Sequence, residues 1–511
     1  MLISLILIPV IGSLLILPMN GACSLQLASM KKIALGTTIL NFFISLFVWF
    51  NFDNASTHYQ FFATFDFTGI APFCRFDLAI DGISIFFLLL TTFISPIAIF
   101  ANYNSTFVGE VENLKAEESL GQSNVKLFLI SFLLLESLQI CAFTACNLVL
   151  FYIFFESVLP ILFVVIILFG HGSDRFRSGY LFFLFTLAGS LPMLLCIIFM
   201  YVYFGSTDFQ FITLFELSTF CQKNLWLGFF FAFAVKTPLY PFIIWLPKAH
   251  SDSPLAGSIL LAATILKLAT YGYLRILIQM LPDATYYFSP LIQSIAIISL
   301  IYGSFSTIVQ QDTKRLIAYS SVCHMAVVVL GLFSNSIQGI EGAILLGIAH
   351  GFVSPALFIC VGGVIYDRTG TRLIKYIRGL ATYMPVFTIL FFVFTLANTG
   401  IPLTLNFLGE QLSLLGIWQQ NPIIAALGAT GIVLSAVYSL FLYNRLSYGN
   451  YSPHLVGEDN NVITPRIVKD INRREYFLLI SLLIPTVFLG LFPNVILDSL
   501  HFTISSILYS V

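Results

Sequence analysis

Residues 147–169 read NLVLFYIFFESVLPILFVVIILF, and this stretch decides the class of fold. Its only charged residue is Glu156, and the run exceeds the ~20 apolar residues that a helix needs to cross a bilayer. The rest of the chain has the same character, since its 511 residues are 58% hydrophobic and only 9% charged. A soluble domain carries about 25% charged residues. The sequence therefore predicts an all-α, polytopic membrane protein.

Apolar runs of this length recur along the chain and predict about fourteen transmembrane helices. The predicted spans are 2–18, 33–52, 80–100, 126–145, 147–169, 179–204, 225–247, 255–280, 290–309, 316–333, 341–365, 384–415, 423–447 and 475–497. The span 384–415 is too long for a single plain helix, and the two spans that meet near Asn147 must form a tight hairpin. The run 208–222 is expected to lie at the membrane interface.

The basic residues test this count independently. Of 23 lysines and arginines, 18 fall in loops that the predicted spans place on one side, against only Arg75 and Lys223 on the other. Lys236, Lys267 and Arg275 lie within spans. Basic residues gather in loops on the cytoplasmic or matrix side of a membrane. The basic loops are therefore expected on that side, and both termini on the opposite side.

The first apolar run, residues 2–17, is interpreted as a retained helix. No basic region precedes it, and the chain does not open with a basic, Ser-rich transit sequence. Residues 21–23, Gly-Ala-Cys, resemble a lipoprotein cleavage box only faintly.

Several classes of function are excluded by what the sequence lacks. A net charge of −1 argues against a nucleic-acid-binding protein. No G-x-G-x-x-G follows a strand pattern and no G-x-x-x-x-G-K-[ST] occurs, so no nucleotide site is predicted. The cysteines form no C-x-x-C pair, and most lie in apolar runs, which favours buried side chains over zinc or iron–sulfur ligands. They are Cys23, Cys74, Cys141, Cys146, Cys196, Cys221, Cys323 and Cys360. We expect no cofactor and no metal in this chain.

Ionisable side chains within the predicted spans are the candidate functional groups. A charge at mid-bilayer is costly, so such residues usually mark ion or proton pathways. The candidates are Glu136, Glu156, Lys236, Lys267 and Glu410, with His324 and His350 as neutral or switchable groups. Ion pairs that only hold helices together are the alternative for any one of them, but the set extends over seven predicted helices.

Prolines lie beside several of these groups. A proline inside a helix frees the carbonyl four residues earlier. Pro160 would free that of Glu156, and Pro238 and Pro241 would interrupt the helix next to Lys236. Broken backbone at membrane depth is tolerated where it lines a polar cavity, so a break beside a buried lysine favours a functional role over simple packing.

The same argument applies to the long span 384–415. Residues 398–402 read NTGIP, and they are expected to break this span ahead of Glu410. Burial destabilises the ammonium form of a lysine and a nearby carboxylate stabilises it, so moving or protonating the carboxylate releases the proton. Glu156 and Lys236 are expected to form such a pair, either in direct contact or through one water molecule. Lys267 would carry the proton next, the two histidines would be intermediates, and Glu410 the exit group. Glu410 lies eight residues after Pro402, so about two helical turns are expected between it and the break, and His324 is its first candidate partner.

Longer motifs resemble the antiporter-like subunits of respiratory complex I. They lie at 233–254 (FAVKTPLYPFIIWLPKAHSDSP), 256–258 (AGS), 266–268 (LKL), 312–325 (DTKRLIAYSSVCHM) and 154–160 (FFESVLP). The similarity covers roughly residues 75–445. Subunits 2, 4 and 5 of the complex share one fold with Mrp-type cation/proton antiporters. Lys-Ala-His at 248–250, and Glu410 where the paralogues usually have lysine, favour the subunit 4 branch.

The resemblance implies fourteen helices with two inverted five-helix repeats, helices 4–8 and 9–13, and breaks in helices 7 and 12. The implied regions are 1–125 (helices 1–3), 126–280 (first repeat), 281–447 (second repeat) and 448–511 (loop, helix 14 and tail). Family roles would fall on Glu156, Lys236, Lys267, His324 and Glu410, and less directly on Glu136 and His350. Ala269-Thr270 stand where the family usually has glycines, which affects local packing and not the role of Lys267.

The function implied is proton translocation coupled to quinone reduction elsewhere in the complex, by a chain without a redox centre. NADH, FMN, iron–sulfur clusters and ubiquinone would belong to partner subunits. The partners would be other membrane subunits, including the paralogous subunits 2 and 5, and membrane lipids. The 54 phenylalanines suggest an A+T-rich genome, so we expect the mitochondrial inner membrane, with a bacterial plasma membrane as the alternative. An Mrp-type antiporter subunit and a structural membrane spacer remain as other functions.

Overall fold

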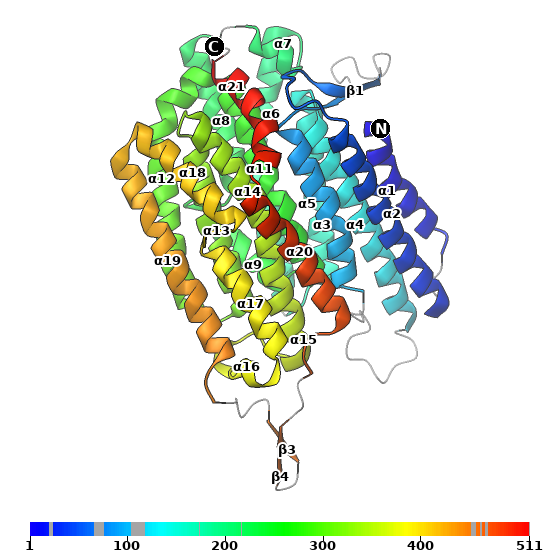
Figure 1. Cartoon of the computed structure of the whole chain (residues 1–511). Coiled ribbons are helices and arrows are strands. Elements are labelled where there is room, and N and C mark those ends of the chain that lie inside the picture. Colours follow the sequence, from blue (N-terminus) through cyan, green and yellow to red (C-terminus); the bar gives the residue numbers. More distant parts are fainter. Residues whose placement is uncertain are drawn as a thin grey trace. The chain divides into compact units, whose positions relative to one another are not determined.

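The computed structural model describes residues 1–19, 24–65, 76–103, 118–172, 174–215, 217–450, 456–459, 462–465 and 469–509. The sequence-based assignments for Gly21-Ala22-Cys23, Cys74, Arg75, Lys115 and Arg466 lie outside these ranges. The chain divides into two compact units, and Figure 1 traces its helices and strands in sequence order. Unit 1 comprises Met1–Thr237, Asp252–Phe288 and Leu497–Val511, and unit 2 comprises Pro238–Ser251 and Ser289–Ile496.

Unit 1 is a helix bundle with one short hairpin. Its elements are α1 (Leu2–Ile16), α2 (Ser24–Phe50), β1 (Gln60–Phe65), β2 (Phe76–Ile80), α3 (Ser84–Ala101), α4 (Glu118–Thr144), α5 (Leu148–Phe169), α6 (Arg175–Phe204), α7 (Phe209–Thr213), α8 (Thr219–Lys236), α10 (Leu255–Leu260), the π-helix η2 (Leu261–Ile265), α11 (Leu266–Gly272) and the π-helix η3 (Tyr273–Ile278). Helix α12 (Pro282–Val309) begins in unit 1 and continues in unit 2.

Unit 2 holds the remaining helices except the last one, most of which belongs to unit 1. They are the 3-10 turn η1 (Phe242–Ile244), α9 (Trp245–Asp252), α13 (Thr313–Leu332), α14 (Ile337–Phe358), the π-helix η4 (Ile359–Ile365), α15 (Tyr366–Thr369), the 3-10 turn η5 (Ile374–Tyr376), α16 (Leu380–Tyr383), α17 (Pro385–Asn398), α18 (Leu405–Gln420), α19 (Pro422–Ser447) and α20 (Arg473–Leu491). Strands β3 (Val456–Asp459) and β4 (Val462–Pro465) pair antiparallel between α19 and α20, and α21 (Asn494–Tyr509) ends the chain.

Each predicted span overlaps a helix of the structure. Eleven helices in the described part are long and apolar enough to cross a membrane, and α1 and α17 are shorter apolar helices. The spans predicted at 225–247 and 384–415 are both interrupted, as expected from their prolines. Since the broken helices cannot be counted as plain spans, the multi-pass membrane architecture is clear while the number fourteen stays a prediction.

The most enclosed helices carry two of the predicted charged groups. The helical segment Leu255–Ile278 contains Lys267, and 94% of its apolar stretch is buried. The segment Ile337–Thr369 contains His350, and its apolar stretch is 100% buried. Outer helices such as α6 expose large apolar side chains, including Leu195 and Val202. This arrangement suits a bundle in hydrocarbon, with apolar groups outside and ionisable groups inside.

The tight hairpin predicted near Asn147 is confirmed. Helix α4 ends at Thr144 and α5 begins at Leu148, and the three residues between them pair with two other segments of unit 1. The Cys146 backbone N–H donates to the Asp77 carbonyl of β2, and the Leu148 N–H donates to the Thr207 carbonyl. These bonds satisfy backbone groups that a sharp helix–helix connection would otherwise leave unpaired.

A buried ion pair joins the start of α3 to η3 in unit 1. The Arg275 guanidinium contacts the Asp81 carboxylate, and the two side chains are 3% and 6% exposed. Asp81 also accepts a hydrogen bond from the Ser84 backbone N–H at 3.0 Å, so the same carboxylate caps α3. Arg275 lay within a predicted span, and the structure supplies the counter-ion that makes its burial tolerable.

We expect Asp81→Asn to lower the stability of the folded chain by about 3–5 kcal/mol, because it leaves the Arg275 charge buried without its partner. The measurement is thermal unfolding of the detergent-solubilised protein together with the amount of folded chain recovered. The double variant Asp81→Leu with Arg275→Met is the control, and it should regain part of the loss because no uncompensated charge remains. Equal instability of both variants would contradict this explanation.

Candidate functional site

Lys236 is the last residue of α8, and its ammonium is buried at 4% exposure. The helix ends here because Pro238 follows and cannot continue the helical hydrogen bonds. The Lys236 Nζ donates to the Phe155 carbonyl at 2.8 Å and lies 3.2 Å from the centroid of the Phe155 ring. One residue of α5 therefore holds the ammonium in two ways, through a carbonyl oxygen and through the face of a ring.

Glu156, the residue after Phe155, interacts electrostatically with Lys236. Its side chain is only partly buried, and Ser190 of α6 lies close enough to interact with its carboxyl group. Within the described residues, no ion pair within 4.0 Å joins Glu156 to Lys236. Direct contact is therefore not the arrangement here, and the alternative of a bridge through one water molecule stays a prediction.

Lys267 lies in α11 between two π-helical segments, η2 and η3, and its side chain is fully buried. Its Nζ donates to the Ala262 carbonyl at 2.7 Å, five residues earlier in η2. A π-turn replaces the i→i+4 hydrogen bonds of an α-helix, and such turns occur often at functional sites. The sequence showed Lys267 but gave no sign of these turns, since no proline or glycine pair marks them.

Glu136 of α4 lies in a third buried group of unit 1. The Asn41 side-chain N–H of α2 donates to Glu136 Oε1 at 2.7 Å, and both side chains are buried. Gln139, one turn later on α4, is also fully buried. Asn41 was missed by the sequence analysis, because a single asparagine in an apolar helix gives no indication of the partner that it faces.

His324 and Glu410 meet in unit 2, which confirms the partner predicted for Glu410. His324 Nδ1 of α13 lies 3.2 Å from Glu410 Oε1 of α18, and the two side chains are 3% and 5% exposed. The His350 ring of α14 lies 5.8 Å from the His324 ring, centroid to centroid. Three groups predicted separately on three helices are thus brought together in one buried cluster.

The break that precedes Glu410 shapes this cluster. Residues between α17 and α18 leave the helical conformation, and Gly400 and Leu403 have φ of 71° and 79°. A Cβ placed on Gly400 would lie 2.7 Å from Glu410 Oε2. We expected about two helical turns between Glu410 and the break, but the side chain points back toward the N-terminus of its helix, as helical side chains do, and reaches the break itself.

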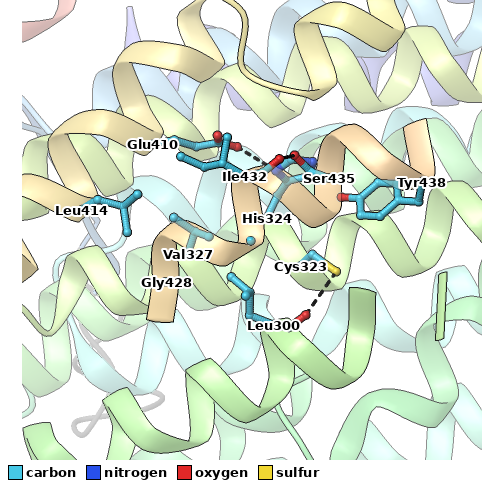
Figure 2. A pocket seen from close by; sticks show the side chains of 11 residues that line it. Leu300, Cys323, His324, Val327, Glu410, Leu414, Gly428, Ile432, Ser435 and Tyr438 are labelled. Atoms are coloured by element: carbon cyan, nitrogen blue, oxygen red, sulfur yellow. Dashed lines mark hydrogen bonds and ion pairs between the residues drawn. The ribbon is translucent and has the colours of Figure 1, made fainter. Parts of the chain in front are cut away.

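A small cavity adjoins the His324–Glu410 pair, as Figure 2 shows. Cys323, Ser435 and Tyr438 also line it, and the Tyr438 hydroxyl points toward Ser435 and His324 in this view. The space open to a water-sized sphere is about 10 Å³, which is room for roughly one water molecule. Tyr438 and Ser435, one turn apart on α19, were not predicted, since neither is unusual in a membrane helix.

The predicted residues divide between the two units. Glu136, Glu156, Lys236 and Lys267 belong to unit 1, and His324, His350 and Glu410 belong to unit 2. His250, quoted above only as part of a motif, is also fully buried in unit 2, where its ring stacks on Phe358 at 4.7 Å. No group of three or more His, Cys, Asp or Glu among the described residues is arranged to hold a metal ion.

Comparisons with known proteins agree on one family. The family described as NADH:quinone oxidoreductase/Mrp antiporter, TM, matches residues 145–435. The NADH-ubiquinone oxidoreductase chain 4 of Mycosarcoma maydis is 52% identical over 510 residues, covering 100% of both chains. The protein of the same name from Arabidopsis thaliana is 42% identical over 503 residues, covering 98% of this chain and 96% of that one.

A solved structure matches over nearly the whole length. A chain of respiratory complex I from Thermus thermophilus with bound NADH superposes with a TM-score of 0.84 at 26% identity. The match covers 99% of each chain.

Proposed function

This chain belongs to the NADH:quinone oxidoreductase/Mrp antiporter family, and we propose that it moves protons through the buried groups described above. It is an antiporter-like membrane-arm subunit of NADH-ubiquinone oxidoreductase, a proton-translocating enzyme, and other subunits of that complex are its partners. The observation that carries the proposal is the burial of ionisable side chains between packed helices. Lys236 and Lys267 contact backbone carbonyl oxygens there, and His324 contacts the Glu410 carboxylate.

In unit 1, the proton carriers of the proposal are Glu156, Lys236 and Lys267. The Lys236 side chain donates a hydrogen bond to the Phe155 carbonyl, and the Glu156 carboxylate attracts its positive charge without direct contact. A change in the charge or position of Glu156 therefore alters how strongly Lys236 holds its proton. Lys267, supported by the Ala262 carbonyl, is the next group that can take up a proton in this unit.

In unit 2, the carriers of the proposal are His324, His350 and Glu410. A histidine beside a carboxylate can pass one proton between them without leaving an isolated buried charge. The cavity beside the pair gives room for a water molecule next to Glu410 and Tyr438. Glu136, hydrogen-bonded by Asn41, is assigned a supporting role in unit 1.

The finer architecture is part of the proposal. Residues 126–280 and 281–447 are the two inverted repeats, with 1–125 and 448–511 as flanking regions, and Lys236 and Glu410 occupy the corresponding broken-helix sites. NADH, FMN, iron–sulfur clusters and ubiquinone belong to other subunits, and the partners of this chain include the paralogous subunits 2 and 5 and membrane lipids. The location is the mitochondrial inner membrane, in keeping with the eukaryotic relatives.

We predict that loop 363–383 faces the matrix, because Arg368, Arg372, Lys375 and Arg378 lie in it. Lys375→Cys should react with a membrane-impermeant thiol reagent only after the inner membrane is opened. Asn54→Cys, in an exposed loop on the predicted opposite side, should react in sealed mitoplasts. Reaction of Lys375→Cys from the outside would overturn the topology.

Phe155→Leu should remove the ring beneath Lys236 and keep the backbone carbonyl. A desolvated cation–π contact contributes about 2 kcal/mol, which corresponds to a factor of about thirty, so we expect proton-coupled quinone reduction to fall by up to about thirtyfold and its pH profile to shift. Phe151→Leu is the matched control, since Phe151 is equally buried at 1% exposure and packs on Phe155. Equal effects of the two variants on rate and pH profile would show that Phe155 only fills space.

Glu410→Gln should reduce coupled turnover, because an amide cannot take up and release a proton. Glu410→Lys should retain more activity, since a lysine still titrates when desolvated. If the carboxylate only holds the break in place, the order reverses, with Gln tolerated and Lys disruptive. Protons pumped per electron pair, measured at matched levels of assembled complex, separate the two.

A further inference from the structure

A basic pocket opens in unit 2 where α12 and α19 end. Its volume is about 530 Å³. The last residues of α12 with Gln310 and Gln311 form one wall, and Leu373 and the η5 segment form a second. Phe441 and Arg445, in the last two turns of α19, complete it. Figure 1 shows α19 running down to the short helix α16, beside which it packs.

Three cations face this pocket, and the part of the chain that the structure describes supplies no counter-ion for them. Lys375, Arg378 and Arg445 line it and are exposed. Among the described residues, none of them forms an ion pair with a carboxylate, and no acidic side chain lines the pocket. Like charges held together repel one another, so an anion that enters is stabilised by all three.

Exposed apolar side chains adjoin the cations. Val309, the last residue of α12, is 77% exposed, Leu373 is 42% exposed and Phe441 is 38% exposed. Val309 and Phe441 belong to helices that are long and apolar enough to span a membrane. A small inorganic anion would make no use of such a wall, whereas an amphiphile would contact it with its hydrocarbon chains.

We propose that this pocket binds an anionic phospholipid, with its phosphate on Lys375, Arg378 and Arg445 and an acyl chain along Val309 and Phe441. Arginine presents a fork of N–H donors that matches phosphate oxygens, and lysine adds a point charge. The pocket lies at the ends of membrane helices on the side where basic residues gather, which is where anionic headgroups are recognised.

The test uses the intact complex, purified in detergent and delipidated. Phosphatidylglycerol is added back in nanodiscs of phosphatidylcholine, and bound lipid is quantified by mass spectrometry. The pocket variant combines Lys375→Gln, Arg378→Gln and Arg445→Gln. The control variant combines Lys32→Gln, Arg177→Gln and Arg473→Gln, three exposed cations that the topology places on the same side and that do not line this pocket.

We expect the pocket variant to bind the tightest phosphatidylglycerol about a hundredfold more weakly, since each basic side chain near an anionic surface contributes about fivefold. The control variant should bind it normally, and zwitterionic lipid alone should not replace it. Unchanged lipid binding in the pocket variant, or displacement of the lipid by millimolar inorganic phosphate, would overturn the proposal. Loss of a neighbouring subunit from the pocket variant, with lipid binding unchanged, would also overturn it and would assign the pocket to an acidic protein segment.

Discussion

Two buried lysines in unit 1 donate hydrogen bonds to backbone carbonyl oxygens, and local irregularities in the helices bring these groups together. Lys236 donates to the Phe155 carbonyl and Lys267 to the Ala262 carbonyl. A tight ion pair would fix a lysine in its charged form, whereas a carbonyl dipole accepts a hydrogen bond from either form of the amine. The helix end at Lys236 and the π-turn that contains Ala262 are the local features that bring these carbonyls and amines together.

Unit 2 stabilises its buried ionisable groups in a different way. The Glu410 carboxylate contacts His324 and also packs closely against Gly400 in the broken segment. A residue larger than glycine at position 400 would collide with it. Glutamate and histidine can share a proton while their combined charge changes little, which limits the cost of burial. The two broken helices therefore serve different groups, a lysine in one unit and a glutamate in the other.

The sequence predicted those features that leave a local mark. Prolines located both helix breaks, isolated charges located the ionisable groups, and the His324–Glu410 pairing followed from the expectation that a lone buried carboxylate has a protonatable partner. The features that were missed arise from tertiary packing. Asn41 is meaningful only beside Glu136, the Phe155 ring only beneath Lys236, and Tyr438 only beside the cavity at Glu410. The π-turns around Lys267 have no residue signature at all, since ordinary helix-forming residues build them.

The central claim is that Lys236 releases and takes up a proton during turnover. The most direct test replaces it by arginine, which keeps a positive charge and hydrogen-bond donors but does not give up its proton. The measurement is the number of protons moved per electron pair, in assembled complex that still oxidises NADH with an artificial acceptor. Fewer protons per electron pair in Lys236→Arg, with slower quinone reduction, is the result that we predict. An unchanged proton number and rate would contradict the claim and leave Lys236 a structural charge.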